Sequence, residues 1–174
     1  MKRLAVYLFL IYLNAGCSQV SDLTQKEARK ILVNELNYPR IVDYEIYCSD
    51  PEHAKKILNT TLEDEGFVEI IRMQKIGDIG KPLVRFTTKA KPYLLYVDEK
   101  QKSLDIQRVK IAEENITHIT ILKGGTDANT ITVEYTTSYA EITPFAVLLM
   151  NNKNESRKRK ALFTWRNEKW LLIK

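Results

Sequence analysis

The sequence predicts an α+β protein, with N-terminal helices and a two-stranded wing followed by an antiparallel β-sheet that includes one short helix. Apolar residues recur at helical spacing through much of the segment 24–62. After the charged segment 98–102, the composition changes to runs rich in Thr, Val, Ile and aromatic residues, which is typical of antiparallel strands. We therefore expect a small α+β part over residues 24–97 and a β-rich part over residues 104–174.

Two helices are expected in the first part. Thr24 and Glu27 match a capping box, and apolar residues at helical spacing follow them. A second helix starts at residues 49–52, where a proline occupies a first-turn position that needs no N–H, and it ends at Gly66. Between the helices, residues 41–47 alternate in polarity and favour a strand.

The second part is predicted to be mostly strands. Residues 124–127 supply a glycine-containing turn, Glu113-Glu114 is expected to be another turn, and residues 145–150 supply the short helix. The expected strands span residues 104–111, 116–122, 130–139, 158–166 and 170–173.

Length and charge set broad limits. With 174 residues, of which 44% are hydrophobic, the chain can bury a core without disulfides or a metal. The formal net charge is +5, and Lys2 and Arg3 carry two of these charges, which leaves +3 for the rest. So small a charge indicates solubility rather than a polyanionic partner, and we expect no nucleic-acid partner. We also expect no cofactor.

The first residues have the pattern of a secretory signal peptide. Lys2 and Arg3 precede an apolar run at residues 4–13, and small residues follow it. The run has about half of the roughly 20 residues that a membrane-spanning helix needs. We therefore expect residues 1–16 to direct export.

The end of this segment, Asn14-Ala15-Gly16-Cys17, resembles the lipobox of bacterial lipoproteins, Leu-Ala/Ser-Gly/Ala-Cys. Ala15, Gly16 and Cys17 match it, whereas Asn14 stands where leucine is usual. The resemblance implies a lipoprotein precursor in which diacylglycerol is attached to the Cys17 thiol. Cleavage before Cys17 and acylation of the new N-terminus, for example with palmitate, would then give a stable membrane anchor.

The same resemblance implies an address in the cell envelope. Residues 17–23 would form a lipidated tether between the membrane and the folded part. Ser18 follows the cysteine, at the place where enteric-type bacteria use aspartate to retain a lipoprotein at the inner membrane. An outer-membrane anchor is therefore expected over an inner-membrane one.

A second resemblance covers residues 54–95. The segment 67–73 and the segment 83–87 predict a pair of strands after a helix, and Thr87-Thr88-Lys89 follows them. This order resembles the end of a winged-helix module, in which a helix leads into a two-stranded wing. In DNA-binding members that helix enters the major groove, but here it carries the acidic run 63–65, which opposes contact with phosphate. We take the resemblance as architecture only.

No catalytic or metal-binding pattern stands out. The only histidines, His53 and His118, have no cysteine or second histidine at metal-ligand spacing. Cys48 and His53 are close enough in sequence to consider a thiol–base pair, but a buried cysteine and a surface histidine are the favoured interpretation. We therefore predict no catalytic residue and no metal site.

Two features of the β-rich part are candidates for binding. A run of basic residues could contact anionic lipid headgroups or cell-wall polymers, or form a solvated hairpin tip; it comprises Arg157, Lys158, Arg159 and Lys160. Aromatic residues could line a ligand cleft or belong to the sheet core; they are Tyr139, Phe163, Trp165 and Trp170.

The leading hypothesis is a membrane-anchored envelope lipoprotein without enzymatic activity. It would act as an accessory or binding component whose partners are the membrane and other envelope proteins. Two alternatives remain open: an enzyme that acts on envelope material through an unrecognised site, and a winged-helix nucleic-acid-binding protein. The last of these requires the first 17 residues to be something other than an export signal.

Overall fold

A computed structural model of the chain describes residues 20–122, 129–150 and 155–173. The molecule combines helices and antiparallel strands, so the predicted α+β class is confirmed. The predicted signal peptide 1–16, Cys17 and the predicted turn 124–127 lie outside the described residues.

The strands are β1 (Arg40–Tyr47), β2 (Val68–Ile70), β3 (Val84–Phe86), β4 (Ile106–Leu122), β5 (Thr130–Ala140), β6 (Ser156–Arg166) and β7 (Lys169–Ile173). The helices are α1 (Gln25–Leu36), α2 (Pro51–Leu58) and α3 (Glu99–Ser103), and the 3-10 turns are η1 (Ile76–Asp78), η2 (Thr88–Tyr93) and η3 (Pro144–Leu148). Within the described residues, β1-β4-β5-β6-β7 form one antiparallel sheet, and β2 and β3 form a second, smaller one.

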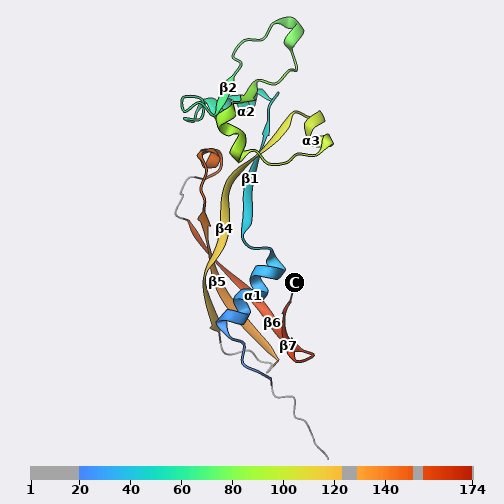
Figure 1. The fold of residues 1–174 in the computed structure, drawn as a ribbon, viewed down its shortest axis with the longest axis vertical. Coiled ribbons are helices and arrows are strands. Elements are labelled where there is room, and N and C mark those ends of the chain that lie inside the picture. Colours follow the sequence, from blue (N-terminus) through green and yellow to red (C-terminus); the bar gives the residue numbers. More distant parts are fainter. Residues whose placement is uncertain (1–19, 123–128, 151–154, 174) are drawn as a thin grey trace, which may run out of the picture.

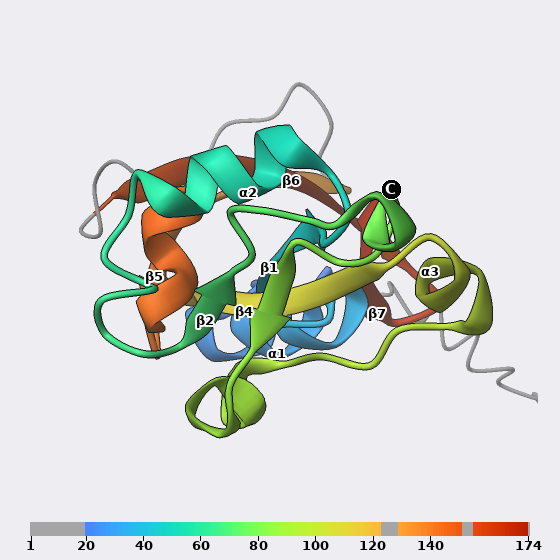
Figure 2. The same ribbon diagram turned by 90° about the horizontal axis from the view of Figure 1, so that it is seen from above.

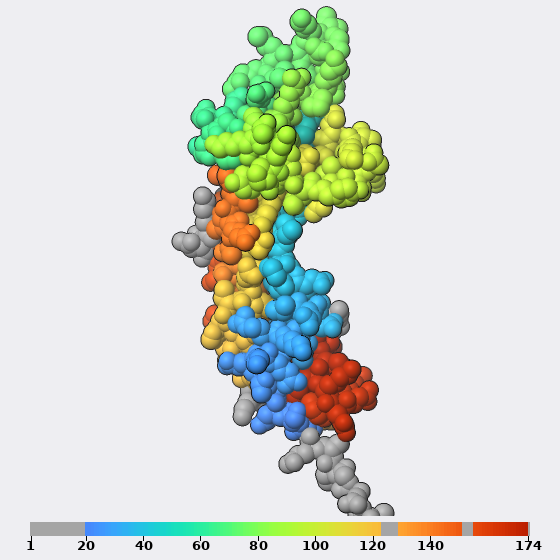
Figure 3. Space-filling view, viewed as in Figure 1, coloured from blue at the N-terminus to red at the C-terminus, as the bar shows by residue number. Residues whose placement is uncertain are grey.

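Strand β4 runs through most of the length of the molecule (Figure 1). Its first half pairs with β1, from Ile106 to Glu114, and its second half pairs with β5, from Glu113 to Leu122. The two partners lie on opposite sides of β4 and overlap only near Glu114. This offset makes the sheet long and curled, and the molecule elongated (Figures 1 and 3).

One hydrophobic core lies at the end of the molecule where the described chain begins. Helix α1 covers the face of β4 to β7, and its Ala28 and Leu32 side chains are fully buried against Val133 and Phe163. The indole Nε1 of Trp170 donates a 2.9 Å hydrogen bond to the carbonyl of Ser21, which fixes the segment before α1. We call this the α1 core.

A second core lies at the other end, between the first half of β4, α2, η3 and the β2–β3 sheet. Figure 2 shows α2 and η3 (orange) around this end of the sheet. Phe145 of η3 is fully buried at its centre, with ring centroids 5.9 Å from Phe67, 6.2 Å from Phe86 and 6.1 Å from Tyr93. We call this the α2 core.

The described residues do not form the predicted N-terminal unit of helices with a two-stranded wing. Helix α1 belongs to the α1 core and α2 to the α2 core, so the two helices do not build a common module. Strand β1, which separates them, pairs with β4 in the main sheet. The strands β2 and β3 do pair, but over three residues each. Because β1 pairs with β4 along its length, α1 and α2 lie on different parts of the main sheet and pack in different cores.

The predicted turn at Glu113-Glu114 is also wrong, because β4 continues through it without interruption. Register shifts opposite Val42 and Asp43 and between Ile116 and His118 change the alternation of the strand. Such bulges interrupt the two-residue alternation of side chains by which the sequence would indicate one continuous strand. Arg29 of α1 donates to the carbonyls of Ile116 and Thr117 at 2.8 and 3.3 Å, which satisfies the irregular backbone there.

Several single elements match the sequence-based expectation, although α2 ends at Leu58 and not at the predicted Gly66. Thr24 caps α1, Pro51 begins α2, and the predicted short helix 145–150 is the turn η3. The charged segment 98–102 forms α3 with a capping box between Asp98 and Gln101. The main sheet takes β1 from before this segment and four strands from after it, while the division into parts 24–97 and 104–174 stays a prediction.

Leu32→Ala should lower the free energy of unfolding by about 2–5 kcal/mol, because it removes a fully buried side chain from the α1 core. Urea denaturation followed by circular dichroism measures this change. Leu104→Ala is the matched control, since Leu104 is 55% exposed, and it should change stability by less than about 0.5 kcal/mol. Equal effects of the two substitutions would contradict the assignment of the α1 core.

Candidate functional site

The most distinctive polar group of the described chain is the carboxylate of Glu114, at the point where the two cores meet. Glu114 lies in β4, opposite Arg40 of β1 on one side and Tyr139 of β5 on the other, and it is 6% exposed. Its Oε1 accepts hydrogen bonds from Thr137 Oγ1 at 2.7 Å and from Arg159 Nη2 at 2.8 Å. The carboxylate therefore joins β4, β5 and β6 through side chains.

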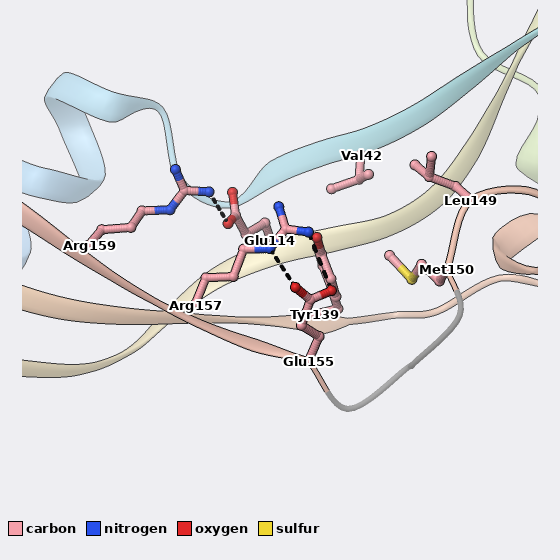
Figure 4. A pocket seen from close by; sticks show the side chains of 8 residues that line it. All are labelled: Val42, Glu114, Tyr139, Leu149, Met150, Glu155, Arg157 and Arg159. Carbon is pink, nitrogen blue, oxygen red and sulfur yellow. Dashed lines mark hydrogen bonds and ion pairs between the residues drawn. The ribbon is translucent and has the colours of Figure 1, made fainter.

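An open cavity of about 440 Å³ lies beside this carboxylate (Figure 4). Residues from β1, β4, β5, β6 and the segment after η3 line it: Val42, Glu114, Tyr139, Leu149, Met150, Glu155, Arg157 and Arg159. One wall is apolar, and the other carries two guanidinium and two carboxylate groups, so the cavity is balanced in charge. We refer to it as the arginine pocket.

The charge on Glu114 is stabilised by its neighbours. Burial by itself would raise the pKa of this carboxyl, but the hydrogen bonds from Thr137 and Arg159 and the positive charges of Arg159 and Arg40 hold its pKa below the ordinary value. Close by, burial and the negative charge of Glu114 raise the pKa of the Tyr38 hydroxyl. Glu114 is thus ionised and Tyr38 neutral near pH 7.

Two buried polar atoms next to this cluster lack a hydrogen-bond partner among the described residues. They are the hydroxyl oxygen of Tyr38 and Nε of Arg159. Such groups are uncommon in folded proteins, where nearly all buried polar atoms are satisfied by protein or ordered water. The cluster around Glu114 therefore has unused hydrogen-bonding capacity.

Arg157 forms the outer side of the arginine pocket. Its Nε and Nη2 donate to the two carboxylate oxygens of Glu155 at 3.1 and 3.3 Å, and its guanidinium lies 5.7 Å from the ring centroid of Tyr139. Both members of this ion pair are about half exposed. A bound anion would have to replace Glu155, which an exposed ion pair permits at little cost.

The predicted basic cluster is divided between the two faces of β6. Arg157 and Arg159 share one face, opposite Thr137 and Tyr135 of β5, and enter the arginine pocket. Lys158 and Lys160 alternate with them and are exposed on the other face. The four side chains therefore do not form one cationic surface.

The predicted aromatic group is divided as well. Phe163 and Trp170 are buried in the α1 core, and Trp165 packs on Trp170 with ring centroids 5.4 Å apart. Tyr139 lies apart from them, against the α2 core and in the arginine pocket. Of these four residues, Tyr139 lines the arginine pocket, whereas Phe163 packs in the α1 core.

Cys48 and His53 do not form a thiol–base pair. The Cys48 thiol is buried and donates to the carbonyl of Ile46 at 3.6 Å, and burial together with the nearby Asp105 raises its pKa to about 11. His53 packs its ring against Tyr44 and Tyr47, and its Nδ1 accepts the backbone N–H of Tyr47 at 3.3 Å. A thiol with so high a pKa is a poor nucleophile at neutral pH.

Over residues 20–122, 129–150 and 155–173, no three His, Cys, Asp or Glu side chains converge in a way that could hold a metal ion. No helix within these ranges combines the length and apolar character needed to cross a membrane. Comparisons of the chain with protein-family models, with curated proteins and with solved structures find no match.

Sequence reasoning missed Glu114, the centre of the site. The sequence predicts a turn at this position, and the partners Thr137 and Arg159 lie 23 and 45 positions away along the chain. A usable signal was present in β6, where alternation places Arg157 and Arg159 on one face. An arginine on a packed face needs an acceptor there, although the sequence does not say which of the carboxylates supplies it.

Glu114→Gln should lower the free energy of unfolding at pH 7 by about 2 kcal/mol, because it weakens one buried and one partly buried hydrogen bond and leaves Arg159 without its counter-charge. The folded-state pKa of Glu114 is depressed, so its contribution is complete above the unfolded value of about 4.3 and is lost as the pH falls through the folded value. Urea denaturation at pH 7 and pH 3 should therefore show a smaller difference between the two proteins at pH 3.

The matched control for this experiment is Glu69→Gln, since Glu69 is an exposed carboxylate in β2. It should change stability by less than about 0.5 kcal/mol at either pH. A stability difference for Glu114→Gln that stays constant between pH 7 and pH 3 would contradict an ionised, stabilising Glu114.

Cys48 should react slowly with a disulfide reagent in the folded protein. A pKa of about 11 in place of about 9 lowers the thiolate fraction at pH 8 roughly 100-fold, before steric protection is counted. Stopped-flow thiol titration of a Cys17→Ser variant, in which Cys48 is the only cysteine, measures this rate. The rate should rise to that of a free thiol in guanidinium chloride, and an equally fast reaction without denaturant would contradict the assignment.

Proposed function

We propose that the protein is a membrane-anchored lipoprotein of the cell envelope, without enzymatic activity, that acts as an accessory or binding component. The lipobox-like segment ending in Cys17 motivates the anchor. The observation that carries the proposal is the way the chain enters the folded body only a few residues later. Ser21 is held by Trp170, and Leu23 is buried in the α1 core.

This short connection supports an anchor that holds the body close to the membrane. The described chain starts at one end of the long molecule, and the β2–β3 sheet lies at the other end (Figure 1). Three residues separate Cys17 from Ser21, and an extended chain spans about 3.3–3.6 Å per residue. The α1 core would then face the membrane, and the α2 core would project from it.

The chemistry of the described side chains favours binding over catalysis. The nucleophile considered from the sequence, Cys48, is buried with a raised pKa. In the arginine pocket, each guanidinium is paired with a carboxylate, Arg157 with Glu155 and Arg159 with Glu114. Such pairs bind and orient polar groups, whereas acid–base catalysis needs a group whose pKa lies near the working pH.

The location and partners follow from the same anchor. Because Ser18, rather than aspartate, follows Cys17, we propose the outer membrane over the inner membrane. An exported protein held at a membrane surface meets other envelope proteins, and these are its proposed partners. No nucleic-acid partner is proposed.

Metabolic labelling with an alkyne analogue of palmitate tests the anchor. The wild-type protein should be labelled and recovered in the membrane fraction, and Cys17→Ala should lose essentially all of the label because the acceptor thiol is gone. Cys48→Ala is the matched control and should be labelled like the wild type. Equal labelling of wild type and Cys17→Ala, or the absence of label from both, would refute the lipoprotein proposal.

The same experiment reports on cleavage. Asn14→Leu restores the usual lipobox residue, so it should raise or leave unchanged the fraction of labelled protein that migrates at the size of the processed form. A lower processed fraction in Asn14→Leu than in the wild type would show that the cleavage signal is not the one proposed.

A further inference from the structure

The cluster around the arginine pocket carries one more positive charge than negative charges. Arg157 and Arg159 line the pocket, and Arg40 of β1 is the cross-strand neighbour of Glu114, which places it on the same face of the sheet. Among the described residues that line the pocket, the carboxylates are those of Glu114 and Glu155. Three guanidinium groups thus stand against two carboxylates, and this excess favours an anionic ligand.

Hydrogen-bond donors are in excess in the same cluster. Arg159 uses Nη2 for its bond to Glu114, while its Nε is buried without a partner among the described residues. The buried hydroxyl of Tyr38 is the other polar atom in this state. A guanidinium nitrogen can only donate, and a neutral tyrosine hydroxyl can donate as well. A ligand that brings acceptors therefore suits the cluster better than one that brings donors.

Arg157 is the guanidinium that a ligand can engage most easily. Its side chain is 50% exposed, and its partner Glu155 is 47% exposed. An exposed ion pair contributes little to stability, so Glu155 can exchange Arg157 for water at little cost. A ligand carboxylate can then accept from Nε and Nη2, the two nitrogens that Glu155 engages at 3.1 and 3.3 Å. The Tyr139 ring contacts the same guanidinium, with its centroid 5.7 Å away.

The opposite side of the pocket is apolar. Figure 4 shows Val42, Leu149 and Met150 on one side of the pocket and the two arginines on the other. Val42 and Met150 are partly buried against the α2 core, whereas Leu149 is 50% exposed. The N–H groups of Leu149 and Met150 both donate to the carbonyl of Ala146, at 3.1 and 2.8 Å, which fixes the backbone of this wall. The exposed Leu149 side chain gives a ligand apolar surface to cover.

We propose that the arginine pocket binds a small organic monocarboxylate with an apolar tail, of the medium-chain fatty acid type. Its carboxylate pairs with Arg157 in place of Glu155, and its tail lies on Leu149 and Met150. The excess of one positive charge suits a monoanion better than a phosphate monoester, which carries about −1.5 to −2 at pH 7. The volume of about 440 Å³ holds about 10–15 non-hydrogen atoms, at roughly 30 Å³ for each water-sized group.

The experiment uses the full chain in phospholipid nanodiscs, with ¹³C-labelled methyl groups on valine, leucine and methionine, and octanoate as the probe. In an NMR titration, the methyl signals of Val42, Leu149 and Met150 should shift and reach saturation. The signals of Leu32, buried in the α1 core, should stay in place. These signals distinguish binding in the pocket from uptake of octanoate by the nanodisc lipid.

Three variants test the polar side of the pocket. Arg157→Gln should weaken octanoate about tenfold or more, because the head loses its charge-assisted hydrogen bonds. Glu155→Gln should strengthen it about three- to tenfold, because it removes the carboxylate that competes for Arg157. Lys158→Gln is the matched control: it removes a positive charge from the other face of β6 and should bind within about twofold of the wild type.

A series of probes tests the chemical class of the ligand. Octylamine, which has the same tail and a positive head, should not shift the pocket signals. Octyl phosphate should bind more weakly than octanoate, and acetate, which lacks the tail, should bind far more weakly. Leu149→Ser should weaken octanoate about fivefold or more without changing the response to acetate, because it removes apolar surface that the tail covers.

This inference deepens the proposed function and rests on it, because it names the ligand class of a binding component. The two can fail separately. Saturable octanoate binding together with unlabelled Cys17 would remove the anchor and leave the ligand of the pocket. Labelled Cys17 together with unshifted pocket signals would leave the anchor and remove the ligand.

Several results would overturn the proposal. These are pocket signals that stay in place up to about 10 mM octanoate, where even a weak ligand binds, and octylamine or octyl phosphate that binds as tightly as octanoate. Unchanged or weaker binding by Glu155→Gln would also overturn it. Urea denaturation verifies that each variant is folded, and Glu155→Gln together with the probe series decides the matter if Arg157→Gln is not.

Discussion

The structure depends on a buried carboxylate at the junction of two cores. Strand β4 has to pair with β1 on one side and β5 on the other, and the partners overlap only around Glu114. Apolar packing is supplied by the α1 core at one end and by the α2 core at the other. Between them, Glu114 binds Thr137 and Arg159 and so connects three strands. Such a partly buried ion pair adds little over apolar residues, but removing one partner is costly because it leaves the other without its counter-charge.

Local signals were sufficient for most single elements. Thr24 and Glu27 mark the start of α1, and Pro51 marks α2, because caps act within one turn of the chain. The arrangement of the helices was not predictable in this way. Whether α2 packs on α1 or on β4 depends on β1, whose partner strand begins about 60 residues later. The wing was inferred from element order, and order does not determine which elements share a core.

The candidate site shows the same limit at the level of side chains. A period of two in β6 is enough to separate Arg157 and Arg159 from Lys158 and Lys160 once the strand is known. The acceptor for Arg159 cannot be predicted in this way, because Glu114 becomes its partner only through the pairing of β4 with β5 and of β5 with β6. The bulge between Ile116 and His118 also interrupts the alternation of β4, the strand that carries Glu114. Long-range pairing, rather than composition, created the arginine pocket.

Trp170 connects the start of the described chain to the last strand of the main sheet. Its ring closes the α1 core, its indole N–H holds Ser21 near the start of the described chain, and its backbone faces the open edge of β7. Because one buried residue does all three, the edge of β7 has a fixed position relative to the start of the described chain. The proposed anchor at Cys17 would then hold this end of the sheet close to the membrane, since three residues separate Cys17 from Ser21.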